Sequence, residues 1–394
     1  MQESEVVNLV RDAIPSSKVG SADFASVRRP LASASHAPGF IYYSDKVLAL
    51  EKEKIFTKEW LCVGRGEEIP KPGDYMTMMV IDEPILLTRN RDGQIRCLAN
   101  MCRHRGVEVA QGSGNTQEFS CPYHAWRYDL DGKLLSASYM RESEGFDQKN
   151  CQLKSIHVGE WAGWIFINLA ANPIPLEDHL AVFADDLAFL RMQDCRIGSK
   201  LIIDLNANWK FVVENLMDMY HARTLHINTF GKYRSPPEKH PLFPRKNGGT
   251  FMLYEAGPMT PDGKTRFRRM PAVEDRADNF AVSAHLAPNM QVIARSDNIH
   301  PLVMWPVTAT TSRTIVYNMF PKEFFEEPDW RERMKVYDDF IRLVLDEDRT
   351  MMDSIQRSVQ SKNFTPGRMS TLEIGIHTVL NDYLDRVWGR GSIA

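Results

Sequence analysis

The sequence predicts an α+β protein in which a small β domain is inserted near the N-terminus of a larger α+β domain. Between residues 60 and 169, short runs with alternating apolar residues are separated by Gly, Pro, Asn and Asp. Strand-like runs return between 250 and 320, and a strongly helical segment follows Pro328. Runs of strands followed by a helical segment indicate helices packed on antiparallel strands rather than βαβ repeats. We expect residues 1–57 to be an N-terminal segment that packs with the larger domain, 58–170 to be the β domain, and 171–394 to be the larger domain.

The individual elements follow from local signals. Residues 1 to about 40 are rich in Ser, Ala and Pro and are expected to be loosely held. A helix is expected over 42–60, capped by Ser44 or Asp45. A second helix is expected over 208–226 and a long one after Pro328. Alternating patterns predict strands at 75–81, 84–90, 163–169, 290–294, 301–307 and 313–320.

Composition excludes several classes of protein. The formal net charge of −3 provides no basic surface for nucleic acid. Apolar runs all fall short of the roughly 18 residues that a membrane span needs. The first residues lack a basic stretch followed by an apolar one, so we expect no secretory signal and a cytoplasmic protein. The cysteines are scattered and do not form a disulfide framework; they lie at positions 62, 97, 102, 121, 151 and 195.

Two short Cys/His pairs predict a metal site in the β domain. Cys102 and His104 are separated by one residue, Cys121 and His124 by two, and sixteen residues lie between the pairs. A structural zinc finger usually draws its cysteines from one hairpin and its histidines from one helix. Here each loop offers one residue of each kind, which suits a two-iron cluster held by cysteines on one iron and histidines on the other. A zinc site remains the alternative on spacing alone.

The stretch CRHRGVEVAQGSGNTQEFSCPYHAWRYDLDGKL resembles the Rieske motif of the ring-hydroxylating oxygenase family. Arg105, Gly106, Trp126 and the Asp131-Gly132 pair also match, whereas Ala125 stands where many members have Gly, and we expect only a small adjustment of the loop. The resemblance extends from about Tyr42 to the C-terminal helix. It implies a Rieske [2Fe-2S] cluster on Cys102, His104, Cys121 and His124. It also implies a catalytic domain of the START/Bet v 1-like type, with helices on an antiparallel sheet.

The segment NWKFVVENLMDMYHARTLH, residues 208–226, predicts a second metal site. His221 and His226 are five residues apart, or about 140° around an ideal helix, so the helix must end or bulge between them if both bind one metal. Two imidazoles and one carboxylate form the facial triad of non-haem Fe(II) oxygenases. On the C-terminal helix, Asp348 falls on an inward stripe, where it must bind a metal or pair with an Arg. That stripe is formed by Trp330, Met334, Tyr337, Ile341, Val344, Met351 or Met352, Ile355 and Val359.

The family resemblance covers this second site as well. The pattern E-N-x2-D-x-Y-H-x4-H matches from Glu214 to His226, and E-D-x4-[ED] matches from Glu347 to Asp353. It implies that His221, His226 and Asp348 bind the mononuclear Fe(II). Glu214, Asn215 and Asp218 are the candidate catalytic residues. In the family, the residue at the position of Asp218 hydrogen-bonds a cluster histidine of a neighbouring subunit; the alternative is that Asp218 orients His221.

The resemblance implies the terminal oxygenase component of a multicomponent enzyme. Electrons from NAD(P)H would arrive through a separate reductase, with or without a ferredoxin, because this chain has no dinucleotide-binding G-x-G-x-x-G after a strand. With O2, the enzyme would hydroxylate an aromatic compound, as in aromatic hydrocarbon catabolism. Alternatives are oxidative N- or O-demethylation, quaternary-amine monooxygenation, a family member without catalysis, or an electron-transfer protein without oxygenase activity. The implied assembly is a ring, a homotrimer or a multiple of it.

The substrate cannot be read from the sequence. Pocket residues are expected from 208–230 and from the strands within 250–320. Arg295 lies in the right stretch to hold a substrate carboxylate, although no arginine can be singled out. The apolar candidates, each of which could equally be ordinary core, are Phe251, Leu253, Met290, Val292, Met304 and Trp305.

Overall fold

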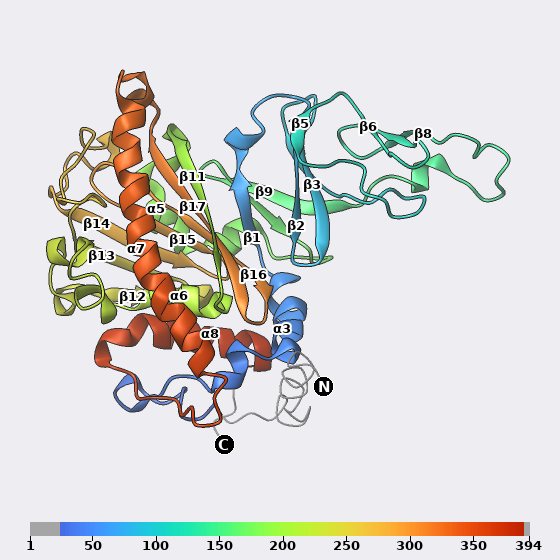
Figure 1. Ribbon diagram of the computed structural model, residues 1–394. Helices are drawn as coiled ribbons and strands as arrows, with labels where there is room; N and C mark the ends of the chain where they lie inside the picture. Colours follow the sequence, from blue (N-terminus) through green and yellow to red (C-terminus); the bar gives the residue numbers. More distant parts are fainter. Residues whose placement is uncertain (1–23, 390–394) are drawn as a thin grey trace, which may run out of the picture. The chain divides into compact units, whose positions relative to one another are not determined.

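The computed structural model describes residues 24–389, which form two compact units. Phe56–Leu176 form one unit, and the chain before and after it forms the other. Both units contain an antiparallel sheet, and helices accompany the sheet of the larger unit (Figure 1). The predicted α+β class, with a small β unit and a helix-on-antiparallel-sheet unit, is confirmed.

The smaller unit presents the Cys/His pairs on loops between strands. The first loop follows β4, and the second joins β6 to β7. The larger sheet has the order β1 (Leu61–Arg65), β10 (Trp164–Asn168), β9 (Ser155–Trp161), β4 (Ile95–Ala99), β3 (Glu83–Arg89), β2 (Asp74–Val80) and β5 (Ser113–Asn115). A three-stranded sheet consists of β6 (Phe119–Ser120), β7 (Arg127–Tyr128) and β8 (Leu134–Ser136).

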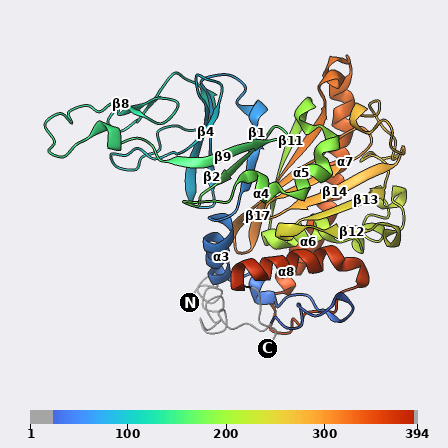
Figure 2. The same ribbon diagram turned by 180° about the vertical axis from the view of Figure 1, so that it is seen from behind.

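The larger unit is a seven-stranded antiparallel sheet with helices against it. Its order is β11 (Cys195–Leu205), β17 (Thr311–Pro321), β16 (Leu302–Thr308), β15 (Met290–Ala294), β14 (Phe280–Leu286), β13 (Thr250–Glu255) and β12 (Leu242–Pro244). The long helix α7 (Trp330–Ser358) crosses the near face of this sheet in Figure 1 and lies behind the sheet in Figure 2. The other helices are α3 (Asp45–Glu51), α4 (Leu176–Leu180), α5 (Val182–Leu187), α6 (Trp209–Met217) and α8 (Ile374–Trp388).

Helix α7 buries one stripe of side chains, as its periodicity predicts. Tyr337, Ile341 and Val344 lie on this stripe, and Asp348 continues it. The predicted stripe is wrong further along, because Ile355 is 45% exposed and Gln356 is buried in its place. The Gln356 amide donates to the Tyr42 carbonyl and accepts from the Asn208 backbone N–H. An inward polar residue is therefore satisfied here, where an apolar one was expected.

The predicted helix over 208–226 is too long. Asn208 caps α6 by accepting from the Lys210 N–H, but the helix ends at Met217, before either histidine. Asp218 is extended (φ −80°, ψ 110°), and its side chain accepts the Tyr220 N–H at 2.6 Å. This local side-chain bond replaces a helical one and redirects the chain. Asp218 and His221 therefore do not share one helix, although their side chains do meet.

Two expectations near the N-terminus also differ from the structure. The predicted helix over 42–60 is shorter: Ser44 stands at the N-cap of α3 without a side-chain cap bond, and the π-helical turn Lys52–Phe56 follows. The loosely held segment predicted for residues 1–40 lies outside the described residues as far as 23. From Phe24 on it is packed, with Phe24 and Val27 buried. In residues 24–389, no helix is long and apolar enough to cross a membrane.

Candidate metal centres

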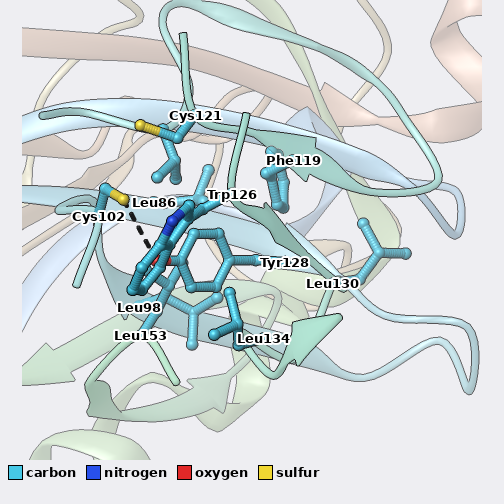
Figure 3. Close-up of a cluster of buried hydrophobic side chains, with 11 residues drawn as sticks. Leu86, Leu98, Cys102, Phe119, Cys121, Trp126, Tyr128, Leu130, Leu134 and Leu153 are labelled. Atoms are coloured by element: carbon cyan, nitrogen blue, oxygen red, sulfur yellow. Dashed lines mark hydrogen bonds between the residues drawn. The ribbon is translucent and has the colours of Figure 1, made fainter. Parts of the chain in front are cut away.

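In the smaller unit, the two cysteines are buried and the two histidines are exposed. Cys102 and Cys121 are each 3% exposed and lie at one side of an apolar cluster that includes Trp126 (Figure 3). His104 and His124 face solvent. A two-iron cluster held here would have its thiolate-bound iron in the protein and its imidazole-bound iron at the surface.

The two histidine rings are aimed at each other. The Nδ1 atoms of His104 and His124 are 3.0 Å apart, and the rings are inclined by 71°. Two metal–nitrogen bonds of about 2.1 Å at near right angles would place the nitrogens about 3.0 Å apart, so the pair fits one metal ion. Trp126 stacks on His104 at 5.0 Å and fixes that ring. Partial desolvation, followed by the charges of His104 and Arg105, lowers the pKa of His124, which favours the neutral, metal-binding imidazole.

The arrangement of the four side chains disfavours a single zinc ion. Tetrahedral zinc with bonds of about 2.0–2.3 Å would bring all four ligand atoms within about 4 Å of one another. Within residues 24–389, the Cys/His set is not among the groups whose ligand atoms all lie within 4.8 Å. A two-iron cluster separates its cysteines from its histidines and has no such requirement.

Hydrogen-bond donors lie close to the sulfur atoms of Cys102 and Cys121. The Tyr128 hydroxyl lies 3.3 Å from Cys102 Sγ and accepts the Arg103 N–H at 3.0 Å. Burial raises the pKa of the Cys121 thiol, while the backbone N–H groups of Tyr123 and His124 lower it. The loop closes through Ala125, whose φ of 53° is in the left-handed region. Alanine is accommodated at this glycine-like position at a cost of about 1 kcal/mol.

In the larger unit, His221, His226 and Asp348 offer ligand atoms that all lie within 4.8 Å of one another. Asp348 Oδ1 is 3.0 Å from His226 Nε2 and 3.5 Å from His221 Nε2. His221 opens the 3-10 turn His221–Arg223, His226 follows that turn, and Asp348 comes from the buried face of α7. Because α6 ends at Met217, both histidines lie beyond the helix, and the separation of about 140° on an ideal helix does not keep them apart.

A carboxylate supports each histidine on its other ring nitrogen. Asp218 Oδ2 lies 3.0 Å from His221 Nδ1, and Glu347 Oε2 lies 2.7 Å from His226 Nδ1. Thr229 donates to the same Glu347 oxygen at 2.7 Å. Such carboxylate–histidine pairs orient metal-bound imidazoles. This role of Glu347 was not predicted from the sequence, where the only signal was its position directly before Asp348.

The electrostatics of this site favour a bound cation. Burial lowers the pKa of His221, but Asp218 and Asp348 raise it more, to about 9. Burial raises the pKa of Asp348, but the two histidines bring it down to about 2. Two imidazoles and a carboxylate, supported by further carboxylates, are a donor set that fits Fe(II).

The remaining candidate catalytic residues divide into two groups. The Asn215 amide donates to Asp348 Oδ1 at 3.0 Å, so Asn215 and Asp218 both touch the proposed ligands. Glu214 points elsewhere and accepts the Tyr42 hydroxyl at 2.8 Å. Burial raises the pKa of Glu214 to about 7, against the effect of the Tyr42 bond. The structure does not bring Glu214 to the metal donors.

A cavity of about 100 Å³ adjoins the three proposed iron ligands. The strand residues named as candidates for either the pocket or the core do not line this cavity: Phe251, Met290, Val292, Met304 and Trp305 are buried elsewhere, and Leu253 is 36% exposed. Their neighbours line the cavity instead. Besides the metal donors, the lining includes Met219, Phe230, Arg234, Met252, Tyr254, Ser283, Ile293, Arg295, His300, Leu302, Val316, Ile341 and Val344.

Comparison with known proteins agrees with this pair of centres. Residues 59–155 match the family described as "Rieske [2Fe-2S] domain", and residues 192–389 match "Ring hydroxylating alpha subunit (catalytic domain)". The carnitine monooxygenase oxygenase subunit of Acinetobacter pittii is 39% identical over 192 residues, 48% of this chain and 52% of that protein. For this relative, the match spans only about half of its length. The glycine betaine monooxygenase oxygenase subunit of Chromohalobacter salexigens is 29% identical, over 96% of this chain and 91% of that protein.

Solved structures extend the comparison to the fold. A quaternary ammonium Rieske monooxygenase superposes with a TM-score of 0.77 at 29% identity, over 91% of this chain and 95% of that one. Naphthalene 1,2-dioxygenase superposes with a TM-score of 0.73 at 20% identity, over 91% and 93%. The second likeness bears on the fold alone. From the two matched domains, the chain belongs to the Rieske ring-hydroxylating oxygenases as an alpha subunit, with a [2Fe-2S] domain and a mononuclear iron domain.

Proposed function

We propose that this protein is the terminal oxygenase of a multicomponent monooxygenase that acts on a small N-methylated or quaternary-amine compound. The observation that carries the proposal is the occurrence of both donor sets in one chain: the Cys/His pairs of the smaller unit, and His221, His226 and Asp348 in the larger. An electron carrier would need only the first set. The relatives with 29–39% identity are named for carnitine and glycine betaine. They favour the quaternary-amine alternative over the aromatic substrate that was expected first.

In the proposed reaction, NAD(P)H, O2 and one proton are consumed, one oxygen atom enters a substrate C–H bond, and the other leaves as water. Bound iron would supply the oxygen chemistry, and the cluster would supply electrons received from a reductase, with or without a ferredoxin. The protein groups hold this site in place. Asn215 fixes Asp348, and Glu347 fixes the His226 ring. Apolar side chains such as Leu302 and Val344 wall the cavity and exclude water.

We further propose a ring assembly, a homotrimer or a multiple of it, in which Asp218 meets His124 of a neighbouring subunit. His104 and His124 are exposed, as such a contact requires. A hollow of about 680 Å³ is lined by Asp218 and His221 on another side of the metal site. Exposed apolar side chains also line this hollow, among them Tyr220 (59%), Met351 (43%) and Ile355 (45%). Exposed apolar surface of this kind favours a protein partner. We expect the assembly in the cytoplasm.

The test is reconstitution with a surrogate NADH-dependent reductase and a panel of L-carnitine, γ-butyrobetaine, glycine betaine and an uncharged aromatic compound. Products are identified by mass spectrometry under 18O2. We expect one labelled oxygen per product, or a labelled aldehyde and the released amine where the hydroxylated carbon is attached to nitrogen. Turnover of the aromatic compound alone would overturn the assignment of substrate class. NADH consumption without any organic product from the panel would also count against it.

A further inference from the structure

Two arginines meet over one tyrosine in the cavity beside the proposed iron ligands. The guanidinium carbon of Arg234 is 4.7 Å from the Tyr254 ring centroid, and that of Arg295 is 4.9 Å from it. Arg295 also donates to the Tyr254 hydroxyl. Arg295 is 3% exposed, so its charge is held inside the protein.

The sheet register explains this meeting. Met252, Ser283 and Ile293 form one row across β13, β14 and β15. Tyr254 lies two residues beyond Met252, and Arg295 lies two residues beyond Ile293, so both point to the same face as that row. The row of Met252, Ser283 and Ile293 is apolar apart from Ser283. The next row, with Tyr254, carries the charge of Arg295. Arg234 reaches the same place from the loop after the 3-10 turn Phe230–Tyr233.

Neither guanidinium forms an ion pair in the described part of the chain, although the charge of Asp218 acts on Arg234 from a greater distance. Within residues 24–389, no carboxylate lies within ion-pair distance of Arg234 or Arg295. The side-chain hydrogen-bond partners of the two guanidinium groups are the sulfur atoms of Met219 and Met259 and the Tyr254 hydroxyl. The Nε atoms of both are buried without a hydrogen-bond partner.

The acids that line the cavity are committed to the metal site. Asp348 contacts both proposed histidine ligands, and Asp218 contacts His221. His300 lies beside Arg295 and carries no negative charge in either protonation state. Burial, followed by the charge of Arg295, lowers its pKa well below the usual range, so the ring stays neutral and adds no third cation. Burial, together with the charge of Arg295, also lowers the pKa of Arg234. Two neighbouring buried cations without a counter-ion are costly unless a ligand supplies one.

We propose that Arg234 and Arg295 form a carboxylate-binding site, so that the substrate is a small acid held by its carboxylate and presented to the iron by its other end. Guanidinium groups match carboxylates in geometry and charge. Leu302, Val316, Ile341 and Val344 line the cavity and suit a methyl-bearing group. At about 100 Å³, the cavity is below the roughly 300–1,000 Å³ of pockets for drug-sized ligands, which favours a small zwitterion. This inference rests on the proposed function and specifies the substrate class for it.

The test measures binding to the iron-loaded holoenzyme by calorimetry without a reductant, so that turnover does not intervene. The ligands are L-carnitine, glycine betaine, the methyl ester of each, and benzoate. We expect at least one zwitterion to bind the wild-type protein, and its ester to bind at least tenfold more weakly. Arg295→Met and Arg234→Met should each raise the Kd of that zwitterion by about 10–100-fold, the range of a lost charge-assisted hydrogen bond. Arg295→Lys should fall between the wild type and Arg295→Met.

Stability provides a second readout. Because each arginine lacks a counter-ion, Arg295→Met and Arg234→Met should leave the Tm unchanged or raise it in the absence of ligand. The matched control is Arg245→Met, since Arg245 pairs with Asp186 at 2.6 and 3.1 Å in the same unit. It should lower the Tm and leave the Kd of the zwitterion unchanged.

The outcomes separate this inference from the function on which it rests. If zwitterion and ester bind alike and the arginine variants change neither Kd, the carboxylate site is wrong while the oxygenase assignment stands. If benzoate alone binds, and does so in an arginine-dependent way, the carboxylate site stands and the quaternary-amine assignment falls. Failure of every carboxylate in the set to bind the wild-type protein would overturn the inference.

Discussion

The two metal centres of this chain are built in opposite ways. In the smaller unit, the four proposed cluster ligands lie between residues 102 and 124, on loops that neighbouring short strands hold. Its histidines face solvent. In the larger unit, the proposed iron ligands are at 221, 226 and 348, and His226 and Asp348 are only 1% and 6% exposed.

This difference shows what each centre needs from the rest of the protein. A cluster between two loops requires only local turns, and its exposed imidazoles are suited to meeting a partner. The mononuclear site exists only when α7 packs against the sheet and brings Asp348 to the two histidines. The charge of this site comes from its carboxylates and its buried histidine. The narrow cavity limits the space available to a small substrate. The first centre is therefore organised for electron entry and the second for selection.

The largest expected effect is the separate loss of each centre. His221→Ala should remove the mononuclear iron and all substrate oxidation, and leave the red-brown visible spectrum intact. Cys102→Ser should abolish that spectrum and all NADH-driven turnover, and leave Fe(II) binding at the other centre. The measurements are iron per chain, visible absorbance and product formation. Loss of both metals from either folded variant would contradict the independence of the two centres, because it would show that each depends on the other.

The same difference explains what could be predicted from sequence. The candidate cluster ligands could be proposed from spacing because they lie close together in sequence. Asp348 could be proposed because the helical periodicity of α7 holds from Tyr337 to Asp348. The path between Asp218 and His226 was missed, since it depends on a side chain, that of Asp218, binding the backbone in place of a helical turn. Glu347 was missed because its partner, His226, lies 121 positions away in sequence.

The face of each strand that holds the cavity was also left open by the sequence. Phe251 and Val292 were candidates for either the pocket or the core; they are buried in the core, and their neighbours Met252 and Ile293 line the cavity. A sheet covered on both faces has apolar residues at both parities, so alternation does not reveal which face holds the cavity. Arg295 could be named as a candidate but not assigned, because its unpaired state and the approach of Arg234 are tertiary facts.

The next largest effect concerns pH and the larger unit. The pKa of Glu214 is raised by burial from 4.5 to about 7 in the folded protein. Protonation therefore favours folding: the contribution is fully present below about pH 4.5 and is lost as the pH rises through about 7. Glu214→Gln keeps an acceptor for Tyr42 and removes the titration. Relative to wild type, the variant should gain up to about 3 kcal/mol of unfolding free energy between pH 4.5 and 8.

Denaturant melts at several pH values check this prediction, with tryptophan fluorescence and cluster absorbance as parallel probes. The exposed Glu142 of the smaller unit provides the control variant Glu142→Gln, which should show no such gain. A stability difference between Glu214→Gln and wild type that is constant from pH 4.5 to 8 would contradict the assignment of a raised pKa.

Asp218→Asn should reduce coupled turnover by about 100-fold while both metals stay bound. Asparagine preserves the size of the side chain and the oxygen that accepts the Tyr220 N–H. It removes the charge 3.0 Å from His221 Nδ1 and the charge proposed to meet His124 of a neighbour. A misplacement of about 1 Å can cost ~100-fold in rate.

Single-turnover oxidation of the pre-reduced cluster, with substrate and O2, measures this effect. Asp346→Asn is the control, because Asp346 is an exposed acid on α7 that pairs with Arg349 at 3.0 Å. A wild-type rate in Asp218→Asn would mean that electrons reach the iron by another route. Conversion to a monomer, seen by light scattering, would identify Asp218 as an interface residue instead.

The smallest expected effect lies in the smaller unit, at Tyr128. Its hydroxyl oxygen accepts the Arg103 N–H, so its proton is free to point to Cys102 Sγ at 3.3 Å. A hydrogen bond to a cluster sulfur stabilises the more negative, reduced cluster and so raises the reduction potential. Tyr128→Phe removes that bond without changing the packing of the ring in the apolar cluster (Figure 3).

We expect Tyr128→Phe to lower the cluster potential by about 40 mV, the equivalent of roughly 1 kcal/mol for a one-electron couple. Protein-film voltammetry of the holoenzyme measures it. Tyr75→Phe is the control, because Tyr75 packs edge-on against Phe119 in the same unit at 5.3 Å and no hydrogen bond joins it to a cysteine. An unchanged potential in Tyr128→Phe would mean that its proton points away from Cys102. A shift of 40 mV slows electron entry by at most about fivefold, so turnover should fall far less than in Asp218→Asn. A larger fall in turnover than in Asp218→Asn would place the sensitive step at the cluster and reverse the comparison between the two centres.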